Sequence, residues 1–167
     1  MAPKLSMIEP AKPMRSHHET ASGCPRDFLG NRFVYVVISS RARGLSIGLN
    51  LNPDKFCTFD CLYCEVERGH PPLERELDIP VMVTELERTL FLAGSGGIRE
   101  LPGFNRLNED LLKLRHVAFS GDGEPTQSPK FEEAVQAVTH VRARKTFPFF
   151  KLVLITNGSG LDLPPVL

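Results

Sequence analysis

Three apolar segments of this 167-residue chain each end in a short cluster of glycine and polar residues, and this repeated pattern constrains the fold most strongly. The segments span 44–52, 116–120 and 151–156, and they are followed by "NPDKFCTFDC", "GDGEPT" and "NGSG". Strands that alternate with helical segments form parallel sheets, and the carboxyl ends of such strands meet at one rim. The pattern predicts an α/β fold with its functional residues at that rim.

Helical segments are expected between these strands. Apolar residues recur at helical spacing within 79–92, and the "GSGG" run at 94–97 ends that segment. Ser128 and Pro129 resemble an N-cap followed by proline at the first helical position, so a second helix should begin there. We also expect a strand or an extended apolar segment at 32–39, a short helix at 106–114 and a last helix capped by Asp162.

Length and composition indicate one domain with a packed core, at 28–167, preceded by a flexible arm at 1–27. Lys plus Arg and Asp plus Glu number 20 each, so the chain has no net charge that would attract nucleic acid or an anionic membrane. No apolar stretch approaches the roughly 20 residues of a membrane span. The first residues also lack the apolar region of a secretory signal, so we expect a cytoplasmic protein without membrane contact.

The run "CTFDCLYC" places Cys57, Cys61 and Cys64 within one short segment. In a reducing compartment, clustered cysteines indicate metal or redox chemistry, and the isolated Cys24 is interpreted as a bystander. Structural zinc takes four ligands, and the neighbouring His70 is followed by two prolines. Zinc, a redox dithiol of "CLYC" and chance clustering of structural thiols remain alternatives. An iron–sulfur cluster with thiolate ligands is favoured.

Three motifs carry a family resemblance. "CTFDCLYC" is similar to the CxxxCx(aromatic)C signature of the radical S-adenosylmethionine (radical SAM) enzymes, with Tyr63 as the aromatic residue. "SGDGEPT" resembles their glycine–glutamate motif at the second barrel strand, and "LITNG" is similar to the segment at their third strand end. The longer run "NLNPDKFCTFDCLYCEV" further resembles the branch of wyosine-base-forming iron–sulfur oxidoreductases. The resemblance covers about 32–167.

The resemblance implies a partial (βα) TIM-like radical SAM barrel of parallel strands that is incomplete at the C-terminus. The family barrel has about six βα units, and this chain supplies three of the expected strands after residue 44. We therefore expect 28–167 to be the N-terminal half of a radical SAM core. The chain would be a fragment, a truncated product or one half of a split enzyme, with a missing C-terminal half as its partner.

The resemblance also implies the roles of particular residues. Cys57, Cys61 and Cys64 would ligate a 4Fe–4S cluster, and no catalytic residue is expected beyond these ligands. Tyr63 would pack beside the adenine of S-adenosylmethionine, or alternatively cap the core as a loop aromatic. The expected contacts to S-adenosylmethionine are Tyr63, Gly121, Asp122, Gly123, Glu124 and Asn157, with Glu124 as a charge partner of the methionine amino group. Family members often carry two adjacent glycines where this chain has Gly121, Asp122 and Gly123.

The implied activity is that of a radical SAM enzyme. One electron from a donor such as flavodoxin or ferredoxin would reduce the cluster, and S-adenosylmethionine would be cleaved to methionine and a 5′-deoxyadenosyl radical. That radical would abstract a hydrogen atom from a substrate. The sequence does not identify this substrate, and RNA is one candidate. The alternative function is a non-catalytic fragment that binds an iron–sulfur cluster or zinc.

Overall fold

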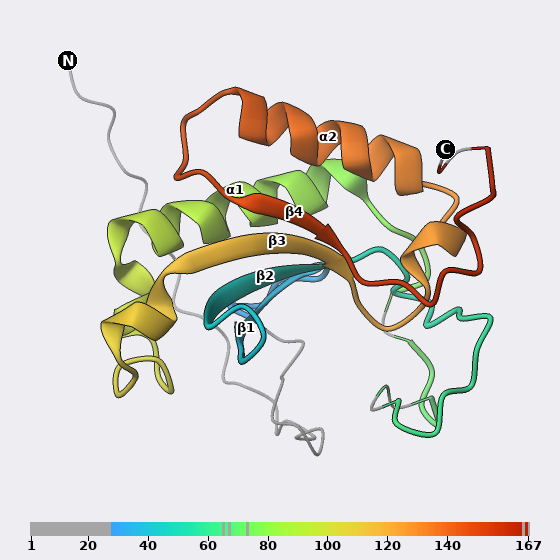
Figure 1. Cartoon of the computed structure of the whole chain (residues 1–167), viewed down its shortest axis with the longest axis horizontal. Coiled ribbons are helices and arrows are strands. Elements are labelled where there is room, and N and C mark those ends of the chain that lie inside the picture. Colours follow the sequence, from blue (N-terminus) through green and yellow to red (C-terminus); the bar gives the residue numbers. More distant parts are fainter. Residues whose placement is uncertain (1–27, 65, 67, 73, 165, 167) are drawn as a thin grey trace.

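The computed structural model describes residues 28–64, 66, 68–72, 74–164 and 166, and the arm expected at 1–27 lies outside these residues. A four-stranded sheet is covered on one face by two helices (Figure 1). The strands are β1 (Val34–Ser39), β2 (Gly44–Asn50), β3 (Leu114–Ser120) and β4 (Lys151–Leu154). The helices are α1 (Ile79–Ser95) and α2 (Phe131–Ala143), with 3-10 turns η1 (Gly97–Glu100), η2 (Glu109–Leu112) and η3 (Pro125–Gln127).

The sheet is mixed, with the strand order β1-β2-β3-β4. β2 pairs in parallel with β3, and β3 pairs in parallel with β4. β1 instead pairs antiparallel with β2, so the expectation of parallel strands throughout is wrong for the first strand. The 40–43 connection between β1 and β2 is short enough for a hairpin, whereas a parallel crossover needs a dozen or more residues. The α/β class itself is confirmed.

Helix α1 begins and ends as its sequence signals indicate. The Asp78 side chain accepts a hydrogen bond of 3.0 Å from the backbone N–H of Val81, which satisfies a donor of the first turn. The left-handed conformation of Gly96 (φ 80°) ends the helix. The helix expected at 79–92 is therefore confirmed and runs slightly further.

Other element boundaries differ from the sequence-based expectations. Within the segment expected to be helical at 106–114, only η2 forms, and β3 already begins at Leu114. Ser128 does not cap α2: it ends the η3 turn, where its backbone N–H donates to the carbonyl oxygen of Pro125, and the residue before the first turn of α2 is Lys130. Helix α2 therefore begins later, at Phe131. Around Asp162 the structure has turns in place of the expected helix.

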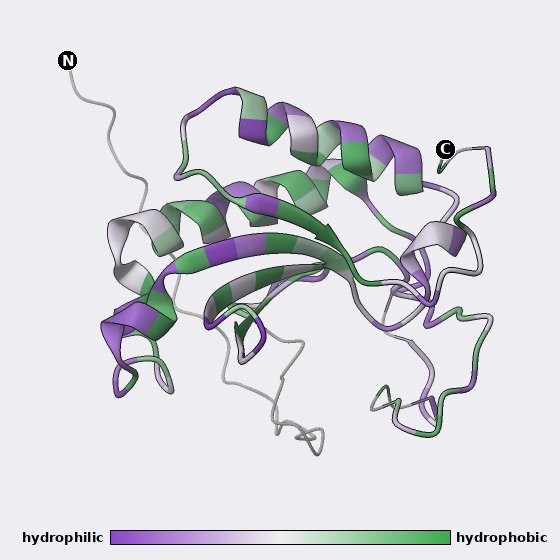
Figure 2. Cartoon of the chain, viewed as in Figure 1, coloured by the Kyte–Doolittle hydropathy of each residue, from purple (hydrophilic) through white to green (hydrophobic). Residues whose placement is uncertain are grey.

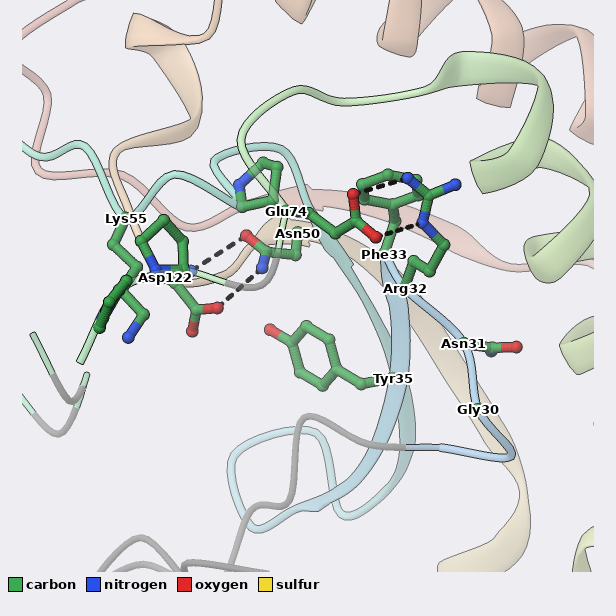
Figure 3. A pocket seen from close by; sticks show the side chains of 12 residues that line it. Gly30, Asn31, Arg32, Phe33, Tyr35, Asn50, Lys55, Glu74 and Asp122 are labelled. Atoms are coloured by element: carbon green, nitrogen blue, oxygen red, sulfur yellow. Dashed lines mark hydrogen bonds and ion pairs between the residues drawn. The ribbon is translucent and has the colours of Figure 1, made fainter. Parts of the chain in front are cut away.

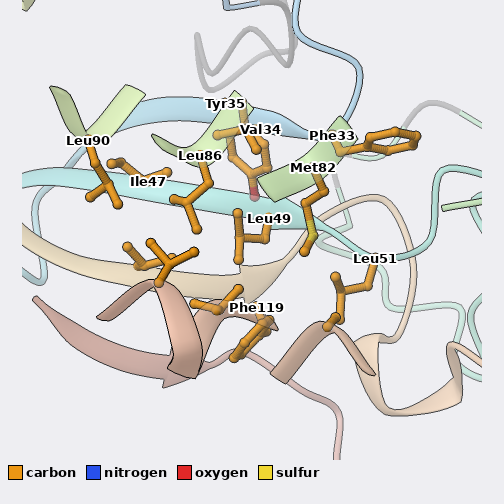
Figure 4. Packing of buried hydrophobic residues seen from close by; sticks show 14 of the residues in the cluster. Phe33, Val34, Tyr35, Ile47, Leu49, Leu51, Met82, Leu86, Leu90 and Phe119 are labelled. Atoms are coloured by element: carbon orange, nitrogen blue, oxygen red, sulfur yellow. The ribbon is translucent and has the colours of Figure 1, made fainter. Parts of the chain in front are cut away.

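The core lies between the helices and one face of the sheet. Alternate residues of β2, namely Leu45, Ile47 and Leu49, are fully buried on that face. From α1, Met82, Leu86 and Leu90 lie one helical turn apart and pack toward them (Figure 4). Along α2, hydrophobic and hydrophilic residues form alternating bands (Figure 2), as expected of a helix with one buried side.

The second face of the sheet carries polar side chains. The ring of Tyr35 lies across Gly48, where a Cβ atom would come within 2.2 Å of it. The Tyr35 hydroxyl forms a 2.7 Å hydrogen bond with Ser120 Oγ, and Ser46 Oγ lies 2.7 Å from His116 Nε2. Burial of the His116 ring lowers its pKa. This face is therefore suited to polar contacts rather than to further helix packing.

None of the helices in the described part of the chain has the length and apolar character required to cross a membrane.

We predict that Leu86→Ala lowers the free energy of unfolding by about 2–5 kcal/mol, because it leaves a cavity between α1 and the sheet. Phe91→Ala is the matched control on the same helix, since Phe91 is 65% exposed. Its effect should stay within about 0.5 kcal/mol. Urea unfolding followed by circular dichroism measures both. Equal losses in the two variants would contradict the packing described here.

Candidate metal and cofactor site

The three neighbouring cysteines lie on the loop that follows β2. The backbone N–H of Lys55 donates to the carbonyl oxygen of Asn52 at 2.9 Å, and this turn redirects the chain away from the sheet. A second turn forms where the N–H of Cys64 donates to the carbonyl oxygen of Cys61, also at 2.9 Å. Cys57, Cys61 and Cys64 are all free thiols, and Cys64 is the most exposed of them. The loop therefore offers three sulfur ligands to solvent.

Hydrogen bonds join this loop to the loops that follow β3 and β4. The N–H of Glu124, after β3, donates to the carbonyl oxygen of Phe56 at 2.9 Å. After β4, Asn157 Nδ2 donates to Thr58 Oγ1 at 3.2 Å, and Ser159 Oγ lies 2.6 Å from the same atom. The three strand-end clusters singled out in the sequence therefore meet at one rim of the sheet.

Two glycines allow the loop after β3 to approach its neighbours closely. A Cβ atom on Gly121, whose φ is 147°, would lie 2.2 Å from Asn50 Oδ1. A Cβ atom on Gly123 would lie 2.0 Å from the carbonyl oxygen of Phe56. Both distances are far below van der Waals contact, so a side chain at either position would push the loops apart.

Asp122, between these glycines, is held by the last residue of β2. Asn50 Nδ2 donates to Asp122 Oδ2 at 2.8 Å, and the N–H of Asp122 donates to Asn50 Oδ1 at 3.1 Å (Figure 3). The two residues line a cavity of about 450 Å³, together with Tyr35 and Lys55. This cavity adjoins the rim where the strand-end loops meet and offers polar contacts to a ligand.

Glu124 is buried at the centre of the rim, with 2% of its surface exposed. Its Oε1 accepts hydrogen bonds from the N–H of Thr126 (3.1 Å), the Thr126 hydroxyl (2.6 Å) and the Thr156 hydroxyl. Its Oε2 accepts from the N–H of Asn157 at 2.7 Å. Burial acts to raise the pKa of this carboxyl, but the hydrogen bonds together outweigh it and hold the pKa below its ordinary value. Glu124 therefore links the loops as a carboxylate.

Polar groups surround the cysteine sulfurs. Asn157 Nδ2 lies 3.7 Å from Cys57 Sγ, and Arg68 Nη2 lies 3.8 Å from Cys64 Sγ. Burial acts to lower the pKa of Arg68, yet the nearby sulfurs of Cys64 and Cys57 raise it overall. A guanidinium and an amide N–H both stabilise the negative charge of thiolates.

The donor set fits an iron–sulfur cluster by its chemistry. Three free thiols on one loop, with a cation and an amide N–H beside them, suit thiolate ligation of iron. Among the described residues, no three metal-ligating side chains form a ready-made metal site, so binding would have to draw the sulfurs together. His70 is likewise not gathered with the thiols into such a group in the described part of the loop.

Tyr63 projects from the cysteine loop. It is 85% exposed, so the alternative that it caps the core is wrong. The neighbouring side chain of Cys61 raises the pKa of its hydroxyl. Its expected position beside adenine stays a prediction, as do the expected S-adenosylmethionine contacts of Gly121, Asp122, Gly123, Glu124 and Asn157.

Sequence reasoning missed several residues that organise the rim. Asn50 could have been found, because it is the polar residue that ends a strand just before the cysteine loop. Thr156 directly precedes Asn157 in the "LITNG" segment that was singled out. Arg68, Thr58 and Ser159 carry no such signal, since their partners are distant or follow only from the folding of the loop.

The comparisons with known proteins identify relatives without establishing a family. No family model matches the chain, and neither does any solved structure. A UPF0026 protein from Helicobacter pylori strain J99 is 25% identical over 139 residues, which is 80% of this chain and 37% of that protein. A UPF0026 protein from Methanocaldococcus jannaschii is 29% identical over 123 residues, or 73% of this chain and 32% of that protein.

The GTPase Obg of Brachyspira hyodysenteriae is 24% identical over 136 residues, which cover 80% of this chain and 16% of that protein. The chain therefore spans roughly a third of the length of the UPF0026 relatives, and less of the GTPase. None of these names mentions radical SAM chemistry or wyosine.

We predict that Glu124→Gln lowers the free energy of unfolding at pH 7 by about 1–3 kcal/mol, because an amide cannot accept all four hydrogen bonds. The pKa of Glu124 is lowered on folding, so its ionised form contributes stability above the ordinary value of 4.5. That contribution is lost as the pH falls through the lower folded pKa.

Denaturant unfolding between pH 3 and pH 7 measures the effect. The difference between wild type and Glu124→Gln should shrink toward the acid end. Glu133→Gln, on the exposed side of α2, is the matched control and should leave the pH profile unchanged. A constant difference across the whole range would contradict the role of the ionised carboxylate.

Proposed function

We propose that this chain carries the cluster- and cofactor-binding part of a radical SAM enzyme, with a 4Fe–4S cluster and S-adenosylmethionine as cofactors. The observation that carries the proposal is the joining of a loop with three free thiols to the loops that follow β3 and β4. Cys57, Cys61 and Cys64 are the proposed cluster ligands. With three thiolates, one iron of a four-iron cluster is left without a cysteine ligand.

The chain's own residues would prepare this site. Arg68 and Asn157 stabilise the negative charge of the thiolates that they contact. The glycines Gly121 and Gly123 let the loop after β3 pack directly against Asn50 and the backbone of Phe56, which holds the cysteine loop beside it. The chemistry that the cluster and S-adenosylmethionine supply when bound is one-electron reductive cleavage of the sulfonium, followed by hydrogen abstraction.

The finer fold is also a proposal. β2, β3 and β4 are parallel, the helices cover one face, and the other face is polar. A TIM-like barrel has helices outside its strands and its site at their carboxyl ends, which agrees with this arrangement. We propose that the sheet belongs to such a barrel in the longer proteins that this chain resembles. A one-electron donor such as flavodoxin or ferredoxin would reduce the cluster. The substrate is not assigned, and RNA is one candidate.

The cluster assignment predicts about four irons and four sulfides per chain after anaerobic reconstitution. Cys61→Ala should lose most of this iron, because the variant removes one of three thiolate ligands. Cys24→Ala is the matched cysteine control and should keep it. Stoichiometric zinc in place of iron would instead support the alternative function, which is that of a non-catalytic metal-binding fragment. Unchanged iron in Cys61→Ala would contradict the ligand assignment.

The cofactor assignment predicts that the reconstituted chain binds S-adenosylmethionine in isothermal calorimetry. Gly123→Ala should weaken binding by at least about tenfold, equivalent to about 1.4 kcal/mol, because its methyl group separates the two loops. Gly94→Ala changes a glycine of α1 and should bind as wild type does. Equal affinity of the two variants would contradict the placement of the cofactor at this rim.

A further inference from the structure

We propose that Asn157 is a positioning residue whose side-chain amide donates a hydrogen bond to the Cys57 thiolate and thereby raises the reduction potential of the cluster. The inference rests on the proposed function and deepens it. It gives this asparagine a role toward the cluster, in addition to the contact with S-adenosylmethionine expected from the sequence.

The hydrogen bonds of Asn157 define which end of its amide faces the sulfur. Its Oδ1 accepts from the backbone N–H of Ser159 at 2.8 Å, so the oxygen points along its own loop. The Nδ2 group then faces the cysteine loop, 3.2 Å from Thr58 Oγ1 and 3.7 Å from Cys57 Sγ. An amide nitrogen has two protons to donate, and these two acceptors use both of them. A flipped amide would place its N–H group against the N–H of Ser159, so that two donors would face each other.

The backbone of Asn157 is also fixed. Its N–H donates to Glu124 Oε2 at 2.7 Å, and Glu124 is itself buried and held by Thr126 and Thr156. The Thr58 hydroxyl, 2.6 Å from Ser159 Oγ, ties the two loops together a second time. The donor is therefore held on a framework that extends from β3 to β4, which limits its freedom to turn away from Cys57.

A fixed N–H donor at a ligand sulfur changes the energy of a cluster in a known direction. Reduction by one electron from dithionite, or from a donor protein, adds one negative charge to the cluster and its thiolates. A hydrogen bond to the sulfur stabilises the more negative state more strongly, and so raises the reduction potential. Removal of the donor should lower the potential, and a carboxylate in its place should lower it further through repulsion.

The test uses the reconstituted full chain in an anaerobic potentiometric reduction with dithionite, followed by electron paramagnetic resonance. At the wild-type midpoint, Asn157→Asp should lower the ratio of reduced to oxidised cluster about tenfold, which corresponds to about 59 mV for one electron. Asn157→Ala should shift the ratio in the same direction by less. Asn105→Asp is the matched control and should not shift it, because Asn105 is exposed on the turn between η1 and η2, a segment that lies at the opposite end of the sheet (Figure 1).

Each result distinguishes the inference from the proposed function on which it rests. Variants of Asn157 that hold wild-type amounts of iron at an unchanged potential overturn the inference and leave the proposed function intact. If both variants lose iron while their circular dichroism spectrum is unchanged, Asn157 is needed to assemble the ligands rather than to set the reduction potential of the cluster. That result also overturns the inference. Wild-type protein that binds no cluster overturns both.

Discussion

The rim of the sheet depends on one buried carboxylate. Glu124 accepts four hydrogen bonds from Thr126, Thr156 and Asn157, while its own N–H binds the carbonyl oxygen of Phe56. One residue therefore joins the loops that follow β2, β3 and β4. A buried carboxylate is costly unless its oxygens are satisfied, and here N–H and hydroxyl donors satisfy them. The loop after β4 is also tied to the cysteine loop, because Thr58 contacts both Asn157 and Ser159.

This arrangement bears on the role of Glu124 toward a cofactor. The family resemblance implies a charge partner for the methionine amino group, and that role stays a prediction. Both carboxylate oxygens already accept hydrogen bonds from the protein, so any contact with a ligand would have to be added to these. The neighbouring cavity, lined by Asn50, Asp122 and Lys55, offers a ligand polar contacts that do not involve Glu124.

The sequence predicted the parts that depend on periodicity. The alternation of Leu45, Ile47 and Leu49 and the helical spacing within α1 indicated the layers, because each element buries one side. The antiparallel β1, the late start of α2 at Phe131 and the short η2 were missed, since local hydrogen bonds determined them. Among the site residues, spacing indicated that three loops would meet. The partners within the site, such as Asn50 with Asp122 or Arg68 with Cys64, depend on tertiary contacts that no single segment encodes.

The central claim is that three thiols on one loop hold a four-iron cluster with one iron open to S-adenosylmethionine. A Mössbauer spectrum of protein reconstituted with iron-57, recorded with and without S-adenosylmethionine, tests it most directly. The account predicts that the signal of about one iron in four changes when the cofactor is added, while the other three stay the same. Four irons that do not respond to the cofactor, or protein that retains no iron at all, would contradict it.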